Sequence, residues 1–308
     1  LHQNMAALAS YSLRKKYFVD IALTYGGNSM LSGDYRFGWF PAISAGWLLT
    51  EEPFLRDQDV ITRLKLRASW GINGNGSIPV DLDEQAFYGG GAYYFTDNLA
   101  NYWGIREGAL ASTFMTHEEA NKTNLGLEAE LFGKLMITGD LFYDIRYGIR
   151  PDDDDVVSHV LGVANPASFV GKVQNAGFDG SMVLQNRIGD FSYHLTGNFL
   201  FTRNKIIEMN EQYRPYDYLM RTGQMIGQHF GLETAGFFED ETDIANSDQH
   251  VFSQVRPGDI KYVDQNDDGV INEYDVIPIG YSAELPEIYY SAALGFEYKG
   301  IGAEVLVQ

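Results

Sequence analysis

The sequence predicts an all-β protein, more specifically a part of a large antiparallel transmembrane β-barrel. Three observations lead to this prediction. Apolar and polar residues alternate along about ten long segments, the links between segments are alternately short and long, and aromatic residues gather near the segment ends. Alternation with period two places successive side chains on opposite faces of a strand.

Segment 135–150 shows the alternation most clearly. Its odd positions are mostly apolar or aromatic, and its even positions are mostly polar or charged. At about 3.3 Å per residue, this strand is roughly 50 Å long. Strands of soluble sheets usually have only about five or six residues. Length is therefore the first sign of a membrane-spanning sheet.

The other segments share this pattern and are rich in β-branched and aromatic residues, without the i, i+3, i+4 stripe of a helix. The ten predicted strands are 6–13, 17–25, 39–50, 61–73, 123–131, 135–150, 171–186, 191–204, 288–298 and 301–308.

The links alternate strictly in length. Short links lie at 14–16, 51–60, 132–134, 187–190 and 299–300, and long links lie at 26–38, 74–122, 151–170 and 205–287. In an antiparallel meander, this order puts all short turns at one end of the sheet. Outer-membrane barrels have this asymmetry, with short periplasmic turns and long extracellular loops.

A water-soluble sandwich or a lipocalin-like barrel would also show alternation, with the apolar face turned inward. Strand length, the alternating links and charged residues in mid-strand favour the membrane barrel. Ten strands with open edges would leave backbone groups unpaired in lipid. We therefore expect the chain to be a piece of a larger barrel.

Composition and motifs narrow the classes of function that the chain could have. The chain has 308 residues, 22 Lys+Arg and 42 Asp+Glu, hence 22 − 42 = −20 net charge, and it has no cysteine. Such a charge disfavours nucleic-acid binding. The six histidines are scattered, and we find no HExxH, GxSxG, P-loop or dinucleotide fingerprint. We therefore expect no enzyme.

The clearest local motif is a calcium-loop pattern at 264–275. Oxygen-bearing side chains occupy its first, third and fifth positions, glycine the sixth, and a backbone carbonyl the seventh. The predicted ligands of Ca²⁺ or a similar hard cation are Asp264, Asn266, Asp268, Val270 and Asp275. The twelfth residue is Asp rather than the usual Glu, and no flanking helices are evident. A turn cluster without metal is the alternative.

Two further loop features are candidate sites. Aromatic residues in the long link 74–122 could stack on a sugar, pack against a partner protein, or fold back into the barrel mouth; they are Tyr93, Tyr94, Tyr102 and Trp103. The acidic run 152–155 is either a solvated loop tip or a cation site.

Several blocks resemble the SusC/RagA family of TonB-dependent outer-membrane transporters of Bacteroidetes. The likeness lies in 37–47, 51–54, 64–75, 171–177 and 256–264, in the same order along the chain. The resemblance implies that 1–308 is part of a 22-stranded barrel domain, and that a plug domain with a TonB box is not present in this chain.

The resemblance also implies a function. A family member would actively import a large nutrient, an oligosaccharide (glycan) or an oligopeptide, across the bacterial outer membrane. It would act beneath a SusD-like surface lipoprotein lid, powered by the TonB complex through the plug, with membrane lipid around the barrel. A passive porin and a soluble calcium-binding β-protein of the adhesin or carbohydrate-binding kind are the alternatives.

Overall fold

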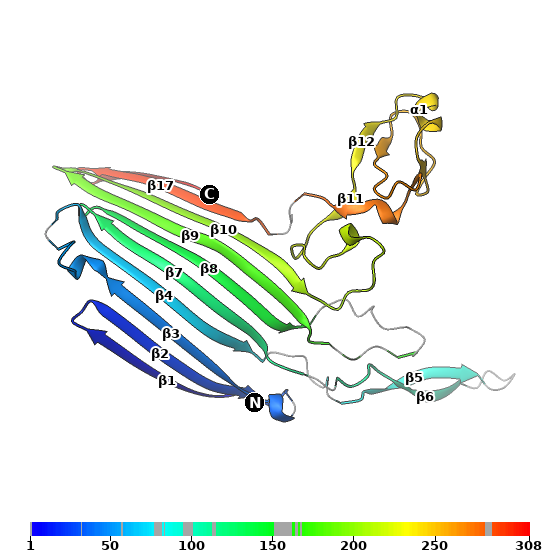
Figure 1. The fold of residues 1–308 in the computed structure, drawn as a ribbon, viewed down its shortest axis with the longest axis horizontal. Helices are drawn as coiled ribbons and strands as arrows, with labels where there is room; N and C mark the ends of the chain where they lie inside the picture. The colour runs from blue at the N-terminus through cyan, green and yellow to red at the C-terminus, as the bar shows by residue number, and fades with distance from the viewer. Residues whose placement is uncertain are drawn as a thin grey trace. The chain divides into compact units, whose positions relative to one another are not determined.

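The computed structural model describes residues 2–31, 33–56, 58–76, 82, 84–94, 101–112, 115–150, 162–163, 166, 168–280 and 285–308. The chain divides into two compact units (Figure 1). Unit 1 comprises 1–204, 208–210 and 287–308, and unit 2 comprises 205–207 and 211–286. The predicted acidic cation site at 152–155 lies outside the described residues.

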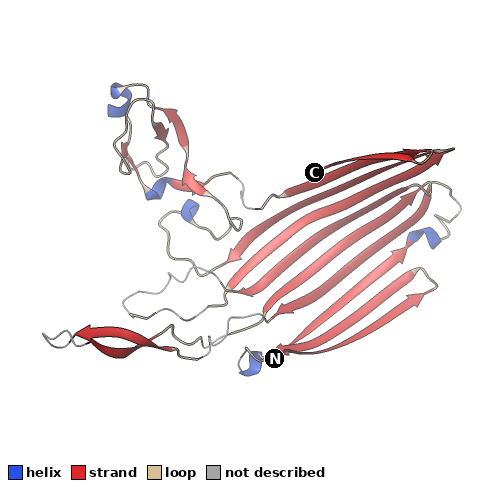
Figure 2. Cartoon of the chain, turned by 180° about the vertical axis from the view of Figure 1, so that it is seen from behind, coloured by secondary structure: helices blue, strands red, loops and turns tan. Residues whose placement is uncertain are grey.

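Unit 1 is built on one antiparallel sheet of ten strands in the order β1-β2-β3-β4-β7-β8-β9-β10-β17-β18. Figure 2 shows the long strands of this sheet side by side. Its strands are β1 His2–Leu13, β2 Tyr17–Asn28, β3 Phe37–Leu48, β4 Ile61–Asn75, β7 Glu118–Leu131, β8 Leu135–Ile149, β9 Gly171–Ile188, β10 Phe191–Glu208, β17 Ile288–Tyr298 and β18 Ile301–Val307. All ten predicted segments are strands, so the predicted fold class is confirmed.

The strands pair in register, so each face of the sheet keeps one character. Across β7, β8 and β9, for example, Leu125 lies opposite Leu141, which lies opposite Phe178. These apolar side chains are 56%, 61% and 44% exposed. Each large apolar side chain left in water forgoes roughly 1.5–3 kcal/mol. This face therefore needs an apolar surrounding, as the predicted membrane barrel provides.

Three short turns have residues in the left-handed region at both central positions, which is the type I′ geometry of tight hairpins. They are Arg14–Lys15 (φ 53 and 57), Phe132–Gly133 (φ 56 and 63) and Lys299–Gly300 (φ 48 and 84). Only Arg14–Lys15 lacks a glycine. Left-handed backbone costs a non-glycine residue about 1–2 kcal/mol, so this turn is the most strained of the three.

The strand ends differ from the predicted ones mainly at the long links. β7 begins at Glu118 rather than 123, and β10 continues to Glu208 rather than 204. Polar residues at these ends mask the alternation, while backbone pairing continues the strand. β3 ends at Leu48 because the chain turns there into the 3₁₀-helix η2, Leu49–Glu51.

The links at the other end of the sheet contain structure of their own. Link 29–36 holds the 3₁₀-helix η1, Gly33–Tyr35. Link 76–117 holds a two-stranded hairpin, β5 Phe87–Tyr94 and β6 Asn101–Glu107. Leu31, Met115 and Phe169 come from three different links and form a small buried cluster with Leu82.

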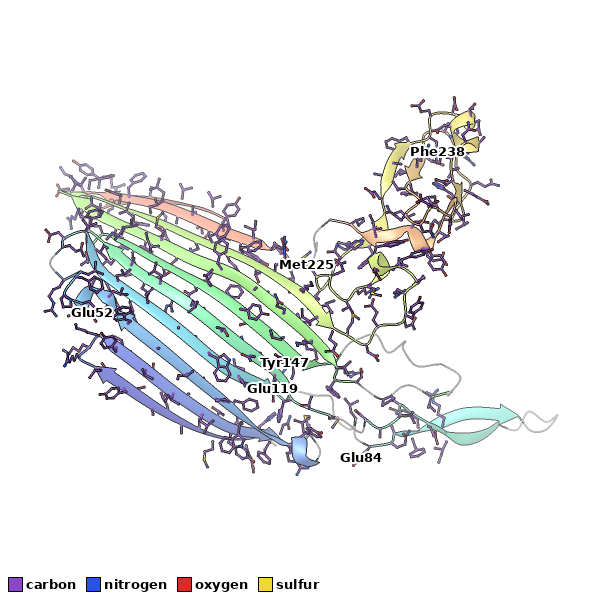
Figure 3. The ribbon with its side chains drawn as sticks, viewed as in Figure 1. Glu52, Glu84, Glu119, Tyr147, Met225 and Phe238 are labelled. Carbon is purple, nitrogen blue, oxygen red and sulfur yellow. The ribbon has the colours of Figure 1, made fainter. Side chains whose placement is uncertain are left out.

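Unit 2 is a small unit of short elements, in which Phe238 is nearly fully buried (Figure 3). Its elements are η4 Asp217–Leu219, β11 Phe230–Leu232, β12 Thr234–Phe237, α1 Glu241–Ala245, β13 Gln249–His250, β14 Ile260–Tyr262, β15 Val270–Ile271, η5 Glu273–Asp275 and β16 Val276–Pro278. The strands pair as β11-β16, β12-β14 and β13-β15. Among the described residues, no α-helix is long and apolar enough to cross a membrane.

Candidate functional site: the polar face of the sheet and the 264–275 loop

On the polar face of the sheet, side chains of different strands form ion pairs across glycines. Arg67 on β4 lies opposite Gly126 on β7, which lies opposite Asp140 on β8. The Arg67 guanidinium passes over the glycine, and its Nη2 lies 2.5 Å from Asp140 Oδ2. A Cβ on Gly126 would lie 2.5 Å from Arg67 Nε and 2.6 Å from Asp140 Oδ1. The missing side chain therefore creates the space for this ion pair.

The ion pair belongs to a small charged network. Glu128 Oε1 lies 3.5 Å from Arg67 Nε, and Glu128 Oε2 lies 3.5 Å from Arg63 Nη2. The next residue in the cross-strand row, Asp179 on β9, lies opposite Asp140. Two basic and three acidic side chains thus share this area, which makes it polar and net negative.

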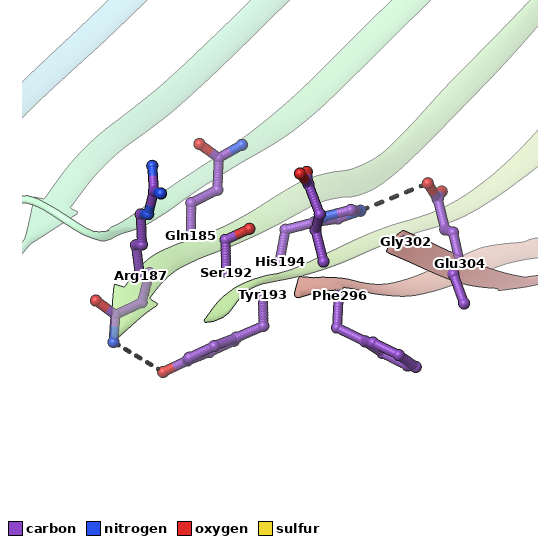
Figure 4. Close-up of a pocket in the computed structure, with 11 residues that line it drawn as sticks. Gln185, Arg187, Ser192, Tyr193, His194, Phe296, Gly302 and Glu304 are labelled. Carbon is purple, nitrogen blue, oxygen red and sulfur yellow. Dashed lines mark hydrogen bonds and ion pairs between the residues drawn. The ribbon is translucent and has the colours of Figure 1, made fainter. Parts of the chain in front are cut away.

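A second contact of this kind lies at the edge of the sheet. His194 on β10 lies flat over Gly295 on β17 and reaches Glu304 on β18, with 3.6 Å between His194 Nε2 and Glu304 Oε2 (Figure 4). A hollow of ≈ 670 Å³ surrounds the pair and is also lined by Gln185, Arg187 and Ser192. Hydroxyl and carboxamide groups continue the polar face elsewhere, as in the 3.0 Å bond from Asn198 Nδ2 to Ser291 Oγ.

A third cluster lies at the short-turn end of the sheet. Glu52, which follows η2 (Figure 3), accepts hydrogen bonds from Tyr17 Oη at 2.6 Å, Trp47 Nε1 at 3.2 Å and Lys16 Nζ at 3.2 Å. The hydrogen bond from Tyr17, then that from Trp47, lower the pKa of Glu52. This carboxylate therefore fixes two aromatic side chains of the apolar face to a turn.

The predicted calcium loop of unit 2 is closed by side-chain-to-backbone bonds. Asp264 Oδ2 accepts the Gly269 N–H at 2.7 Å, and Asn266 Oδ1 accepts the Asp268 N–H at 3.1 Å. Asp268 Oδ1 accepts the Val270 N–H at 2.8 Å. Burial alone would raise the pKa of Asp264, but the backbone N–H groups that it accepts, first that of Gly269, outweigh burial and lower it.

The twelfth loop residue, Asp275, is fully buried. Its carboxylate accepts the N–H groups of Gln265 at 2.9 Å and Asn272 at 2.8 Å, so it joins the start of the loop to its end. Within the described part of the chain, no three His, Asp or Glu side chains form a group that could hold a metal ion. The predicted set also uses the Asn266 amide and the Val270 carbonyl, and calcium binding stays a prediction.

Tyrosines adjoin this loop. Tyr216 stacks on Tyr218 with 5.3 Å between ring centroids and meets Tyr274 edge-on at 6.2 Å. Tyr216 Oη accepts a 3.2 Å hydrogen bond from Asn266 Nδ2. Burial, followed by the negative charge of Asp275, raises the pKa of Tyr218. This cluster was not predicted from the sequence, because Tyr216 and Tyr218 lie at least 56 residues from Tyr274 along the chain.

The loop is also joined to a histidine stack. Gln249 and His250 pair in parallel with Val270 and Ile271. The His250 ring meets the Phe238 ring edge-on, with 5.3 Å between centroids, and stacks on the Tyr262 ring at 5.6 Å. Burial lowers the pKa of His250.

The structure places the predicted loop aromatics in a hairpin rather than in irregular loop. Tyr93 and Tyr94 lie in β5, and Tyr102 and Trp103 lie in β6, with Tyr93 opposite Tyr102. The glycine run before Tyr93 suggested loop, but a register shift between Gly89 and Ala92 accommodates it within the strand. The side chains of these four aromatics lie outside the described part of the structure.

Comparison with known proteins identifies relatives of the whole sheet. No protein-family model matches the chain. TonB-dependent receptor P26 of Formosa agariphila is 24% identical over 307 residues, which cover 95% of this chain and 30% of the relative. TonB-dependent receptor SusC of Bacteroides thetaiotaomicron is 26% identical over 281 residues, covering 86% of this chain and 27% of the relative.

Solved structures agree on the fold. The structure of the RagAB peptide transporter matches 99% of this chain and 32% of its own chain, with a TM-score of 0.76 and 17% identity. The resemblance to SusC/RagA-type TonB-dependent receptors is confirmed. The outer membrane transporter YddB of Escherichia coli matches more loosely, with a TM-score of 0.52, 12% identity and 97% of this chain covered.

The likeness to TonB-dependent receptors indicates which face of the sheet lies outside a barrel and which lies inside. The chain spans only about a quarter to a third of the length of the relatives above. The ten-strand sheet has the fold of part of the barrel in these relatives. The apolar face with Leu125 and Leu141 is then the outside of the barrel, and the polar face with Arg67 and Asp140 lines its interior.

Proposed function

We propose that this chain is the part of an outer-membrane, TonB-dependent importer that forms about ten strands of the barrel wall. The observation that supports this most strongly is the shared fold over 99% of the chain with the RagAB peptide transporter, together with sequence similarity to SusC. The cargo is a large nutrient, an oligosaccharide or oligopeptide. The protein transports this cargo and does not transform it.

The proposal includes two partners. A SusD-like lipoprotein closes over the long-link end of the barrel, and the TonB complex supplies energy through a plug domain outside this chain. The aromatics of the β5–β6 hairpin, Tyr93 and Tyr94 with Tyr102 and Trp103, contact the lid or the cargo. Aromatic side chains stack on sugars and pack on proteins alike.

Cellular uptake tests the proposal. Cells that produce the full-length protein take up fluorescent oligosaccharides or oligopeptides, and an uncoupler that collapses the proton gradient stops this uptake. Uptake that continues unchanged with the uncoupler would identify a passive porin instead. Affinity purification of the tagged protein from detergent-solubilised outer membranes recovers a surface lipoprotein if the lid exists.

A variant without unit 2 tests whether this unit contributes to binding of the lipoprotein lid. The Thr202 N–H donates to the Glu287 carbonyl at 2.9 Å, and Arg203 forms a bidentate pair with Glu287 at 2.7 and 2.8 Å. The two chain segments that enter and leave unit 2 are thus already joined. Residues 205–286, which also include the last four residues of β10 and residues 208–210 of unit 1, can be replaced by a two-residue turn that leaves the pairing of 191–201 with β17 intact. We expect normal barrel assembly and reduced lipoprotein recovery.

A further inference from the structure

The apolar face of the sheet contains a hollow near its short-turn end. The hollow has a volume of ≈ 980 Å³ and extends over β2, β3, β4, β7, β8 and β9. Small residues of three strands, Ala45, Ala68 and Gly139, belong to its lining, and the rings of Tyr17 and Trp47 border it. A gap of this volume in an otherwise bulky apolar face can take a hydrocarbon chain.

The turn beside this hollow is cationic. Tyr17 directly follows the turn of Arg14, Lys15 and Lys16. Arg14 and Lys15 are exposed, whereas Lys16 is paired with Glu52 at 3.2 Å. Two exposed positive charges therefore lie at the end of the hollow where a membrane has its headgroups.

Backbone strain at this turn points to a role for its side chains. Asn-Gly is the pair that a type I′ turn favours, because both central residues have positive φ. Here Arg14 and Lys15 occupy these positions with φ 53 and 57. An Asn-Gly pair would avoid this strain, which makes the two basic side chains candidates for a functional role.

We propose that this hollow and turn form a binding site for one anionic phospholipid of the membrane. The phosphate headgroup binds Arg14 and Lys15, and an acyl chain lies in the hollow over Ala45, Ala68 and Gly139. This inference depends on the proposed function only in that the apolar face must lie in a bilayer. Basic residues at a membrane surface attract anionic lipids, with about fivefold in affinity per charge.

Native mass spectrometry of the full-length protein, released from nanodiscs, tests the site. The probes are phosphatidylglycerol and phosphatidylcholine with the same acyl chains. We expect the wild-type protein to retain phosphatidylglycerol in preference to phosphatidylcholine. The double variant Arg14→Asn/Lys15→Gly should lose about tenfold or more of this preference, since two charges are removed. Its turn is the favoured Asn-Gly pair, so misfolding does not explain the loss.

Two further variants separate headgroup from chain. Ala68→Leu fills the hollow and should weaken the retention of both lipids. Lys299→Asn removes a charge from another type I′ turn, one whose residues do not line the hollow, and should change nothing. Inorganic phosphate in excess should not displace the lipid, since the acyl chain contributes to binding.

Several outcomes would overturn the proposal. These are unchanged phosphatidylglycerol retention in the double variant, unchanged retention in Ala68→Leu, or an equal loss in Lys299→Asn, which would mean unspecific surface charge. Displacement by inorganic phosphate would identify a free-anion site instead. Failure of the protein to enter nanodiscs at all would refute the membrane barrel itself, and is therefore distinguishable from failure of the lipid site.

Discussion

Substituting Gly126 by alanine tests whether the glycine exists for the ion pair that crosses it. The new Cβ would lie 2.5 Å from Arg67 Nε, 2.6 Å from Asp140 Oδ1 and 2.7 Å from Arg67 Cγ. Real Cβ atoms do not approach this closely, so the side chains of Arg67 and Asp140 must shift, which disrupts the geometry of their ion pair. The strand backbone itself offers no obstacle to alanine.

The expected magnitude follows from two opposing effects. A hydrogen bond between charged groups contributes roughly 1.5–3 kcal/mol. The Arg67 side chain is 39% exposed and that of Asp140 is 12% exposed, so screening by water favours the lower end of that range. Replacing glycine by alanine in a strand returns roughly 0.5–1 kcal/mol. We therefore expect a net loss of about 1 kcal/mol.

Urea unfolding of the full-length protein in liposomes, followed by tryptophan fluorescence, measures this loss. Gly139→Ala is the matched control, because among the described residues other than its chain neighbours its Cβ would meet just the Asp179 carbonyl oxygen within 4 Å, at 3.9 Å. It should be neutral or slightly stabilising. In an Asp140→Asn background, the cost of Gly126→Ala should shrink. Equal stability of the Gly126 and Gly139 variants would refute the argument.

Three further predictions concern titrating and metal-binding groups. Since its folded-state pKa is lowered, Glu52 stabilises the fold at neutral pH, and this contribution is lost as pH falls through that pKa. Glu52→Gln should therefore have a lower urea midpoint than the wild type at pH 7. The difference between the two proteins should vanish in acid. The lowered pKa of His250 means that unit 2 loses stability as pH falls below about 6.5. Hydrogen-exchange protection factors at 241–252, corrected for the intrinsic pH dependence of amide exchange, should fall there in the wild type and less in His250→Phe. Terbium bound at 264–275 should show tyrosine-sensitised emission, which calcium should remove by displacing the terbium. Asp264→Asn should abolish this emission, whereas Glu273→Gln should not. Emission retained in Asp264→Asn would contradict the metal loop.

The strands of the barrel could be predicted from the sequence, because period two is a local property. Residues 135–149 alternate regardless of their neighbours, and β17 and β18 meet at a Lys-Gly pair that fits a two-residue hairpin. Strand ends at the long links were less predictable. The alternation of β7 is hidden in 118–122, where both faces carry polar residues.

The contacts within the sheet and unit 2 could not be predicted in the same way. Gly126 becomes informative only when the registers of both neighbouring strands are known. In unit 2, the Glu211 carboxylate accepts the N–H groups of Arg221 and Thr222 at 2.6 and 2.9 Å, and such bonds leave no periodic pattern. For Glu211, burial would raise the pKa, but these donors outweigh it and lower it.

Small residues have different roles on the two faces of the sheet, and this predicts how substitutions on the two faces combine. On the polar face, Gly126 makes room for a side chain to cross a strand, whereas on the apolar face Ala68 and Gly139 leave a hollow. Neighbouring residues of one strand point to opposite faces, so Arg67 and Ala68 serve different surroundings. Residues this close usually couple by about 0.5–3 kcal/mol, whereas distant residues add within about 0.5 kcal/mol. Because the affected side chains face opposite sides of the sheet, we expect the stability changes of Gly126→Ala and Ala68→Leu to add as those of distant residues do. A larger coupling in the double variant would mean that the two faces communicate through a shift of the β4 backbone.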